Sequence, residues 1–294
     1  MAVASAAGGT YPGETNWGAF DQNYAVTDDT PAAANNGAAQ TTIVAWEQNS
    51  DLWIEGRNAD NSRTTLVQRF PGGMAATTQA PSATFLRYDF AVVWRGMDNR
   101  IWYSVNPDGA IATLATNWTQ PRAITNPNGG FVTTSATPTI TETGGRVTVA
   151  YRGASNSNSN IWTIDGTLGS SNLVLNWSNN AQTGFSSPSS PSITNFAGTQ
   201  VPTPLRSRSR PVLTAAGNQM MITSLTHGSA YTDGSIMTRA RYSGDVGAWG
   251  NWNNDPQQWH SFSAPVLYAI STAIYILIRG GTNGVIYGKE VSRN

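Results

Sequence analysis

An arginine followed by glycine recurs along the chain in a setting that suits recognition of a polar ligand. Arg95-Gly96, Arg152-Gly153 and Arg279-Gly280 each follow a short apolar run, and an aromatic residue comes a few positions later. A guanidinium presents several N–H donors in fixed directions, and glycine lets a ligand approach the backbone closely. An aromatic ring can stack on the apolar face of a sugar while polar groups bond its hydroxyls. This combination of residue types predicts a carbohydrate-binding surface.

The candidate ligand-binding residues come from the arginine position, from the turn after it, and from two aromatic positions farther along each repeat. They are Arg95, Asp98, Asn99, Trp102, Trp118, Arg152, Trp162, Trp177, Arg279 and Tyr287. We expect the second and third repeats to hold the strongest sites, because both keep Trp at the two aromatic positions. A Trp at a repeated position can instead belong to the core, and a repeated Arg can instead bridge neighbouring repeats. Both interpretations stay open from the sequence.

Residues suited to metal binding or catalysis are sparse. The chain has no cysteine and only two histidines, His227 and His260, so we expect no metal site and no cofactor. A glycosidase needs two or three carboxylates on the inner strands of a propeller, and only Asp29 and Glu142 stand there, at strand ends. Sialidases use arginines to hold a carboxylate, but here the arginines occupy equivalent repeat positions. We therefore predict no catalytic residues and a non-enzymatic protein, with a glycoside hydrolase or sialidase-like enzyme as the alternative.

The candidate residues lie in a repeat of short strands. Within FAVVWR, Phe90, Val92 and Trp94 alternate with Ala91, Val93 and Arg95, which is the period of two that a β-strand gives. The same second-strand motif recurs at 41–48, 90–97, 147–154, 221–228 and 274–281, and a proline opens the first strand of each copy at Pro31, Pro81, Pro138, Pro211 and Pro265. Five such copies predict an all-β fold, a five-bladed β-propeller of four-stranded antiparallel blades. A β-sandwich or a right-handed β-helix is the alternative.

We expect one propeller domain over residues 1–294, without a boundary between independent domains. Its blades are predicted at about 29–70, 80–118, 136–177, 210–252 and 264–291, with a long excursion at 179–210. The fifth copy ends before a fourth strand, and Thr15-Asn16-Trp17-Gly18 matches Thr116-Asn117-Trp118-Thr119. A closing strand at about 15–20 is therefore predicted to complete the last blade and remove two exposed sheet edges.

The amino-acid composition of the chain excludes some classes of binding partner. The formal net charge is zero and 12% of the residues are charged, so we expect no broad basic face for nucleic acid. No apolar run reaches the length of a membrane span, and the first residues lack the basic and apolar regions of a secretory signal. We therefore expect no membrane insertion, and a soluble protein that is cytoplasmic or exported without a standard signal. The oligomeric state is not indicated.

Trp94-Arg95-Gly96-Met97-Asp98-Asn99, followed by Ile101-Trp102, resembles the repeats of bacterial and fungal β-propeller lectins, whose blades carry an Arg-Gly-x-Asp-Asn-x-Leu-Trp motif. Further copies are Tyr151-Arg152-Gly153 with Ile161-Trp162 and Ile278-Arg279-Gly280 with Ile286-Tyr287. Residues 104–109 look like the Asp-box turn of sialidase-like propellers. The resemblance implies a multivalent lectin that binds glycans in repeated shallow sites on or between the blades. A third hypothesis for the function is a propeller that serves as a scaffold for protein partners.

Overall fold

Every regular element in the described part of the chain is a β-strand, and all strand pairs are antiparallel. The computed structural model describes residues 29–36, 41–57, 68–69, 75–86, 89–106, 118–126, 128–154, 161–168, 175–177, 193–194, 200–201, 210–217, 219–225, 236–242, 253–254, 261, 263–270, 272–279 and 286–291. The predicted all-β fold with antiparallel sheets is confirmed.

The strands form five sheets, numbered here in chain order, and one separate strand pair within the described residues. Sheet 1 contains β1 (Ala32–Asn36), β2 (Thr41–Gln48), β3 (Asp51–Arg57) and β4 (Gln68–Arg69). Sheet 2 contains β5 (Ser82–Leu86), β6 (Asp89–Arg95), β7 (Ile101–Asn106) and β8 (Arg122–Ala123). Sheet 3 contains β9 (Thr139–Thr143), β10 (Arg146–Arg152), β11 (Ile161–Leu168) and β12 (Leu175–Trp177).

The C-terminal sheets follow the same up-and-down order. Sheet 4 contains β15 (Val212–Ala216), β16 (Gln219–Leu225), β17 (Ile236–Tyr242) and β18 (Asn253–Asn254). Sheet 5 contains β19 (Val266–Ile270), β20 (Ala273–Arg279) and β21 (Ile286–Glu290). The separate pair, β13 (Ile193–Thr194) with β14 (Gln200–Val201), lies in the predicted excursion.

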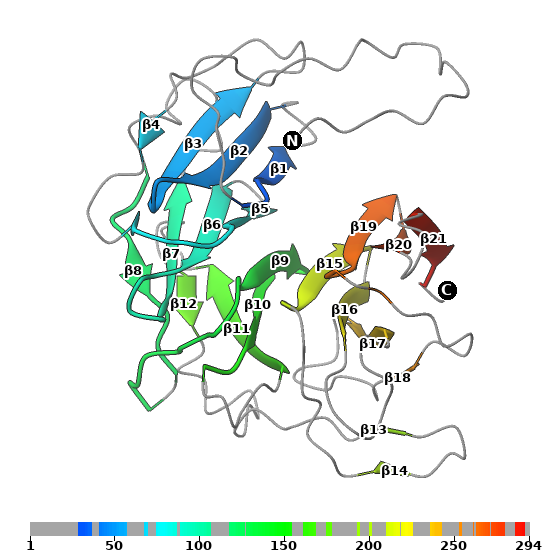
Figure 1. Ribbon diagram of the computed structural model, residues 1–294. Helices are drawn as coiled ribbons and strands as arrows, with labels where there is room; N and C mark the ends of the chain where they lie inside the picture. Colours follow the sequence, from blue (N-terminus) through cyan, green and yellow to red (C-terminus); the bar gives the residue numbers. More distant parts are fainter. Residues whose placement is uncertain are drawn as a thin grey trace.

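The first strand of each sheet lies toward the middle of the molecule (Figure 1). These inner strands follow one another in space, with β1 beside β5, β5 beside β9, β9 beside β15, and β15 beside β19. Five sheets whose inner strands are arranged in this way fit a five-bladed β-propeller. The number of blades and the closure of the ring stay predictions.

A proline directly precedes each of the five inner strands. Pro31, Pro81, Pro138, Pro211 and Pro265 stand one residue before β1, β5, β9, β15 and β19. Proline has no backbone N–H and is tolerated at the first residue of a strand. Contacts between neighbouring inner strands join like ends: Asp29 before β1 with Ala80 before β5, Ile140 near the start of β9 with Ser82 at the start of β5, and Thr143 at the end of β9 with Gly217 after β15. These four inner strands therefore run in one direction. We call the end at which they begin the proline face. The hairpins between second and third strands lie at the same face, because the strands alternate in direction.

Apolar side chains fill the space between neighbouring sheets. The alternation predicted in β6 places its two sets of side chains against different neighbours. Phe90, Val92 and Trp94 pack with Ile43 and Ala45 of sheet 1. Ala91 and Val93 pack with Val147, Val149 and Ile140 of sheet 3. Similar clusters join sheets 3 and 4 through Ala150, Leu213 and Ile222, and sheets 4 and 5 through Met221, Leu225, Ile274 and Ile276.

The fourth strand of sheet 2 differs from its expected position. We predicted it around Trp118, whereas β8 pairs with Trp102 and Tyr103 of β7 farther along the chain. Near Trp118 the chain is bonded to β7 by the Thr119 amide, which donates to the Val105 carbonyl at 2.9 Å, and by side chains. Thr119 Oγ1 accepts from the Val105 amide at 3.0 Å, and Ser104 Oγ donates to the Thr119 carbonyl at 2.6 Å. These side-chain bonds replace a regular ladder at that point.

Closure of the ring generates the first prediction. The closing strand at 15–20 lies outside the described residues, while β21 is the last strand of sheet 5 and Ile286 in it is 72% exposed. Deletion of residues 1–20 is expected to lower the melting temperature by about 5–10 °C, since each kcal/mol of lost stability lowers Tm by about 2–4 °C in a chain of this size. Calorimetry measures the shift, and deletion of residues 1–10 is the control. A melting curve unchanged by the longer deletion contradicts closure.

Candidate functional site

The hairpin that joins β6 to β7 at the proline face carries most of the predicted site residues of sheet 2. The Gly96 amide donates to the Arg100 carbonyl and the Asn99 amide donates to the Gly96 carbonyl, both at 2.9 Å. Asn99 has φ of 64°, a left-handed conformation that Asn tolerates better than most residues. The tight turn leaves Met97, Asp98 and Asn99 exposed to solvent.

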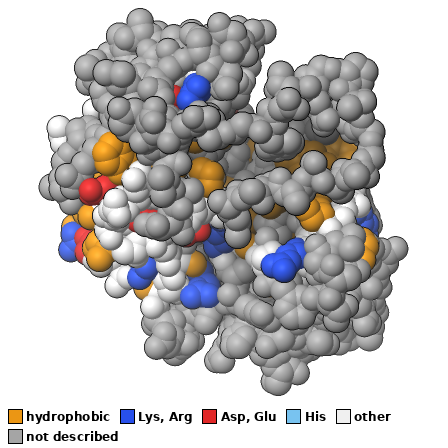
Figure 2. Space-filling view, turned by 45° about the horizontal axis from the view of Figure 1, so that its top comes forward, with side chains coloured by type: hydrophobic (Ala, Val, Ile, Leu, Met, Phe, Trp, Pro, Cys, Tyr) orange, Lys and Arg blue, Asp and Glu red, His pale blue; other side chains and the backbone are white. Residues whose placement is uncertain are grey.

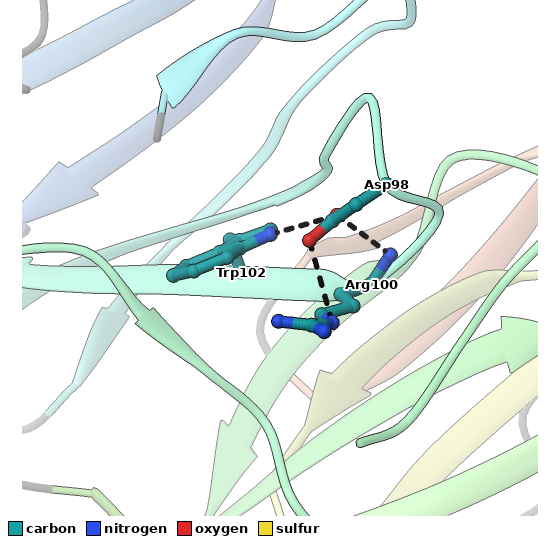
Figure 3. Close-up of polar contacts among 3 residues, drawn as sticks. All are labelled: Asp98, Arg100 and Trp102. Carbon is teal, nitrogen blue, oxygen red and sulfur yellow. Dashed lines mark hydrogen bonds and ion pairs between the residues drawn. The ribbon is translucent and has the colours of Figure 1, made fainter. Parts of the chain in front are cut away.

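Asp98 organises the hairpin through both of its carboxylate oxygens (Figure 3). Oδ1 accepts from the Arg100 amide at 3.0 Å and from the Trp102 indole Nε1 at 3.1 Å. Oδ2 lies 3.4 Å from Arg100 Nε. Trp102 lies on β7, so its contact with the hairpin tip fixes the indole edge while the ring stays partly exposed. The predicted pair Asp98 and Trp102 is therefore brought together.

Arg95 ties this hairpin to the segment that leads into sheet 3. Its Nε donates to the Thr134 carbonyl at 3.1 Å, and its Nη2 donates to Asn99 Oδ1. The Thr134 amide in turn donates to the Asn99 carbonyl at 2.9 Å, and Arg100 forms a β-bridge with Thr133. The sequence left open whether Arg95 serves a ligand or bridges repeats, and these contacts show that it bridges two sheets while staying partly exposed.

Arg152 makes an equivalent contact from sheet 3. Its Nε donates to Ser135 Oγ at 2.8 Å, and its carbonyl accepts from the Ser135 amide at 3.0 Å and from Thr134 Oγ1 at 2.9 Å. Burial lowers the pKa of the Arg152 guanidinium, and the positive charge of Arg95 lowers it further. Arg95 and Arg152 therefore bond to two adjacent residues of the chain, Thr134 and Ser135.

Phe131 is part of this surface, and the sequence analysis did not select it. Its side chain is 50% exposed, and Arg100 Cζ lies 3.7 Å from its ring centroid. Met97 at the hairpin tip is 62% exposed. The only sequence signal was an aromatic residue directly after the Asn128-Gly129-Gly130 turn, outside every repeated position. We define the hairpin site as Arg95, Asp98, Asn99, Trp102 and Phe131.

The remaining predicted site residues are spread over several environments. Trp118 is 7% exposed and belongs to the core between sheets 1 and 2. Trp162 is half-buried against the core between sheets 2 and 3. Tyr287 packs against the core between sheets 4 and 5, and Arg279 is exposed at the end of β20. Trp177 lies in β12, and its side chain is outside the described part. Their ligand-binding roles stay predictions.

A charged pair lies where inner strands begin on the proline face. Asp29 precedes β1 and is exposed, and its Oδ2 accepts from the Ala80 amide at 2.9 Å. Arg210 precedes β15 in sheet 4. Burial lowers the pKa of the Arg210 guanidinium, and its attraction to the Asp29 carboxylate opposes that change. Asp29 therefore links the beginnings of sheets 1 and 2 by a hydrogen bond, and its charge acts on Arg210 at the beginning of sheet 4.

The described residues contain no group of three or more His, Cys, Asp or Glu side chains placed to hold a metal ion. Among the same residues, no helix is long and apolar enough to cross a membrane.

Comparison with known proteins identifies structural neighbours but no sequence family. No protein-family model matches the chain, and no curated protein matches it. A Bifidobacterium bifidum s17 protein assigned as an exo-β-1,3-galactanase has a TM-score of 0.49 and 10% identity, with 90% of this chain and 87% of that chain covered. The GH43_1 enzyme from Xanthomonas citri, complexed with xylose, gives 0.47 and 11%, with 89% and 86% covered. The catalytic domain of a GH62 α-L-arabinofuranosidase from Coprinopsis cinerea gives 0.45 and 11%, with 92% and 91% covered.

These neighbours correct one expectation from the sequence. We predicted a protein without enzymatic activity, and that prediction is contradicted, because the neighbours are named as enzymes of the glycoside hydrolase kind. The absence of carboxylates from the middles of the inner strands was the reason for the prediction. The finer resemblance to lectin repeats is not confirmed by these neighbours.

The close packing inside the hairpin generates the second prediction. A Cβ atom at Gly96 would lie 2.6 Å from Asp98 Oδ1 and from two atoms of the Trp102 indole. Gly96→Ala should therefore lower the free energy of unfolding by about 1–3 kcal/mol, as overpacking typically does. Gly130→Ala is the matched control, because a Cβ atom there would meet only the Asn126 side chain, at 3.1 Å from Nδ2, a gap that a small shift relieves. Urea unfolding compares the two variants, and equal stability of both would refute the tight packing.

Proposed function

We propose that this protein is a glycoside hydrolase that binds its glycan on the proline face of the ring. The face combines exposed carboxylates, arginines and partly exposed aromatic rings within one surface. Carboxylates perform the acid–base and nucleophilic steps of glycoside cleavage. Aromatic rings and arginines supply the stacking and hydrogen bonds that hold a sugar.

The observation that carries this proposal is the position of Asp29. Its carboxylate is exposed, held by the Ala80 amide at 2.9 Å, and close enough to Arg210 for their charges to interact. Ala80 leads into β5 and Arg210 into β15, so the carboxylate is bonded at the beginning of sheet 2 and its charge acts on a residue at the beginning of sheet 4. A carboxylate oriented in this way can act on a bond of a glycan that lies across the centre of the ring.

The other inner-strand acid that the sequence suggested, Glu142, lies at the opposite end of β9. Its Oε1 accepts from the Gly145 amide at 2.6 Å in the turn that follows the strand. Inner strands rise about 3.3 Å per residue, so the four residues from Pro138 to Glu142 separate the two faces by roughly 13 Å. The two carboxylates of a glycosidase stand at most about 9.5 Å apart, so Glu142 does not serve with Asp29.

The second carboxylate is therefore sought on the proline face. The acids described there besides Asp29 are Glu47, Asp51 and Asp98. Glu47 is buried and accepts from the Ser50 amide at 2.7 Å, so it stabilises its own hairpin. Asp51 forms a β-bridge with Ala76 in the segment that continues to Ala80, the residue that holds Asp29. Asp51 and Asp98 are the two candidates.

The hairpin site supplies glycan contacts in this proposal. Asp98 holds the indole edge of Trp102, and Phe131 presents half of its side chain to solvent. The equivalent position of sheet 3 offers Arg152 with the partly exposed Trp162, and sheet 5 offers Arg279 with Tyr287. Repeated weak contacts of this kind raise the avidity for a polymeric substrate.

The experiment that tests the function measures the release of reducing sugars from a panel of plant and fungal polysaccharides. The wild type should cleave at least one of them, and Asp29→Asn should lower kcat by roughly 10²–10⁴-fold, because the carboxylate takes part in the reaction. Glu142→Gln is the matched control and should retain activity. Asp51→Asn and Asp98→Asn, tested on the same substrate, identify the second carboxylate.

Two outcomes would contradict this proposal. One is a wild-type protein that cleaves none of the polysaccharides at any pH between about 4 and 8, the range in which a carboxylate pair works. The other is an Asp29→Asn variant with wild-type kcat. Thermal unfolding of each variant checks that a loss of activity does not come from loss of the fold.

A further inference from the structure

Phe131 stands on a turn of the chain that lies outside the repeated pattern of strands. The Asn126 side chain closes this turn, because its Oδ1 accepts from the Asn128 and Gly130 amides, both at 3.0 Å. The Gly130 carbonyl accepts from the Asn126 amide at 2.8 Å, and Phe131 forms a β-bridge with Thr125. The backbone that carries the ring is therefore fixed by several hydrogen bonds.

The Phe131 ring is exposed although its backbone is held. Phe131 is 50% exposed, and among the described residues it is a member of no apolar core cluster. Arg100 Cζ lies 3.7 Å from the ring centroid, so the guanidinium covers one face of the ring. The exposed part of the ring is therefore directed away from Arg100.

The exposed neighbours of Phe131 along the chain are polar. Asn128 and Thr133 are exposed, whereas Val132 is buried. One ring among polar groups is far smaller than the apolar patches of more than a few hundred Å² that mark protein interfaces. It suits a molecule that has one small apolar face and many hydroxyl groups. A pyranose ring has this structure, since its C–H bonds can stack on an aromatic ring while its hydroxyls bond polar groups.

The charge beside the ring is balanced. Arg100 Nε lies 3.4 Å from Asp98 Oδ2 (Figure 3), so a negative group accompanies the positive one. In the view of Figure 2, blue Lys and Arg side chains on the described surface are likewise separated by white, orange and red ones. The formal net charge of the chain is zero. A surface of balanced charge does not favour a ligand of either sign, so the sugar expected at Phe131 is neutral.

The order of the strands gives the distance of this ring from the candidate carboxylate. Ala80, which bonds Asp29, stands two residues before β5, and β5, β6 and β7 are neighbours in sheet 2. Ile101 begins β7 at the same face, and its amide donates to the carbonyl of Val132, the residue after Phe131, at 3.0 Å. Three steps between neighbouring segments, each about 4.8 Å, therefore separate Ala80 from Phe131, which gives roughly 14 Å.

We propose that Phe131, held by Arg100, forms an outer subsite for a neutral sugar unit of a long glycan chain whose cleaved bond lies at Asp29. The inference rests on the proposed function for the glycan, and it adds the charge class of the sugar and the length of the chain. Stacking of a sugar on the ring covers its exposed part, while the guanidinium fixes the opposite face. A disaccharide at Asp29 is shorter than the separation between the two places, so only longer chains gain this contact.

A purely structural role for Phe131 makes a different prediction. If the ring serves only to hold Arg100 in its hairpin, replacement of the ring lowers stability and leaves glycan binding unchanged. Leucine separates these roles, because it keeps an apolar side chain but removes the flat ring. Tyrosine is the matched control at the same position, because it keeps the ring.

The first test is affinity electrophoresis of the full chain, which measures binding without cleavage. The gels contain soluble arabinoxylan, arabinan, galactan, glucomannan or mixed-linkage glucan, with polygalacturonate as the acidic comparison. At least one neutral polymer should retard the wild type, and more strongly than polygalacturonate does. Phe131→Leu should weaken this affinity about two- to tenfold, the range expected for the loss of one aromatic contact, and Phe131→Tyr should keep it.

The second test concerns chain length and uses a polymer that the protein cleaves. Phe131→Leu should raise KM for the polymer severalfold and leave kcat unchanged, because the contact lies far from the reacting bond. For a disaccharide of the same sugar, kcat/KM of the variant should equal that of the wild type. An equal loss on the disaccharide and the polymer would contradict an outer subsite.

Four results of the electrophoresis overturn the inference. They are no retardation by any neutral polymer, stronger retardation by polygalacturonate, wild-type affinity in Phe131→Leu, and a loss in Phe131→Tyr as large as that in Phe131→Leu. A fall in Tm of more than about 5 °C in Phe131→Leu would assign the ring a structural role and has the same effect. Asp29→Asn should be retarded like the wild type, so a failure of the catalytic proposal and a failure of this subsite are distinguishable.

Discussion

Apolar packing between neighbouring sheets is the interaction on which the rest of the molecule depends. A single four-stranded sheet with apolar residues on both faces cannot bury them alone, so each sheet needs a neighbour on either side. Strand β6 meets this requirement with Phe90, Val92 and Trp94 on one face and Ala91 and Val93 on the other. Burial at about 25 cal/mol per Å² makes this packing the main stabilising term. It also leaves the strand ends and hairpins, where polar groups are tolerated, at the two ends of the sheets.

The position of the candidate site follows from this packing. Polar groups that the core cannot accept gather on the proline face, where strands of different sheets end close together. Arg95 and Asn99 from one sheet are bonded to Thr134 at the beginning of the next. Asp29 similarly joins its own sheet to Ala80. The side chains of the candidate site are thus held by contacts between sheets.

Elements that depend on local properties of the chain were predicted correctly from the sequence. Positions that depend on contacts between distant segments were not. The motif at 41–48 coincides with β2, and all five prolines stand directly before inner strands, because a period of two and a missing N–H are local properties. The position of β8 was missed because bonds of Ser104 and Thr119 replace the ladder near Trp118. Phe131 was missed because its exposure beside Arg100 depends on a bridge to the hairpin. The non-enzymatic prediction, which rested on the scarcity of carboxylates on the inner strands, was contradicted by the structural neighbours.

The prolines before the inner strands have a consequence for the backbone at the proline face. Each proline lacks a backbone N–H, so each inner strand is preceded by a residue that offers an acceptor and no donor. Ala80, directly before Pro81, still has its amide hydrogen, and that hydrogen is donated to Asp29. The covalent structure of five residues therefore shifts the balance of backbone groups at this face toward acceptors, independently of any side-chain charge.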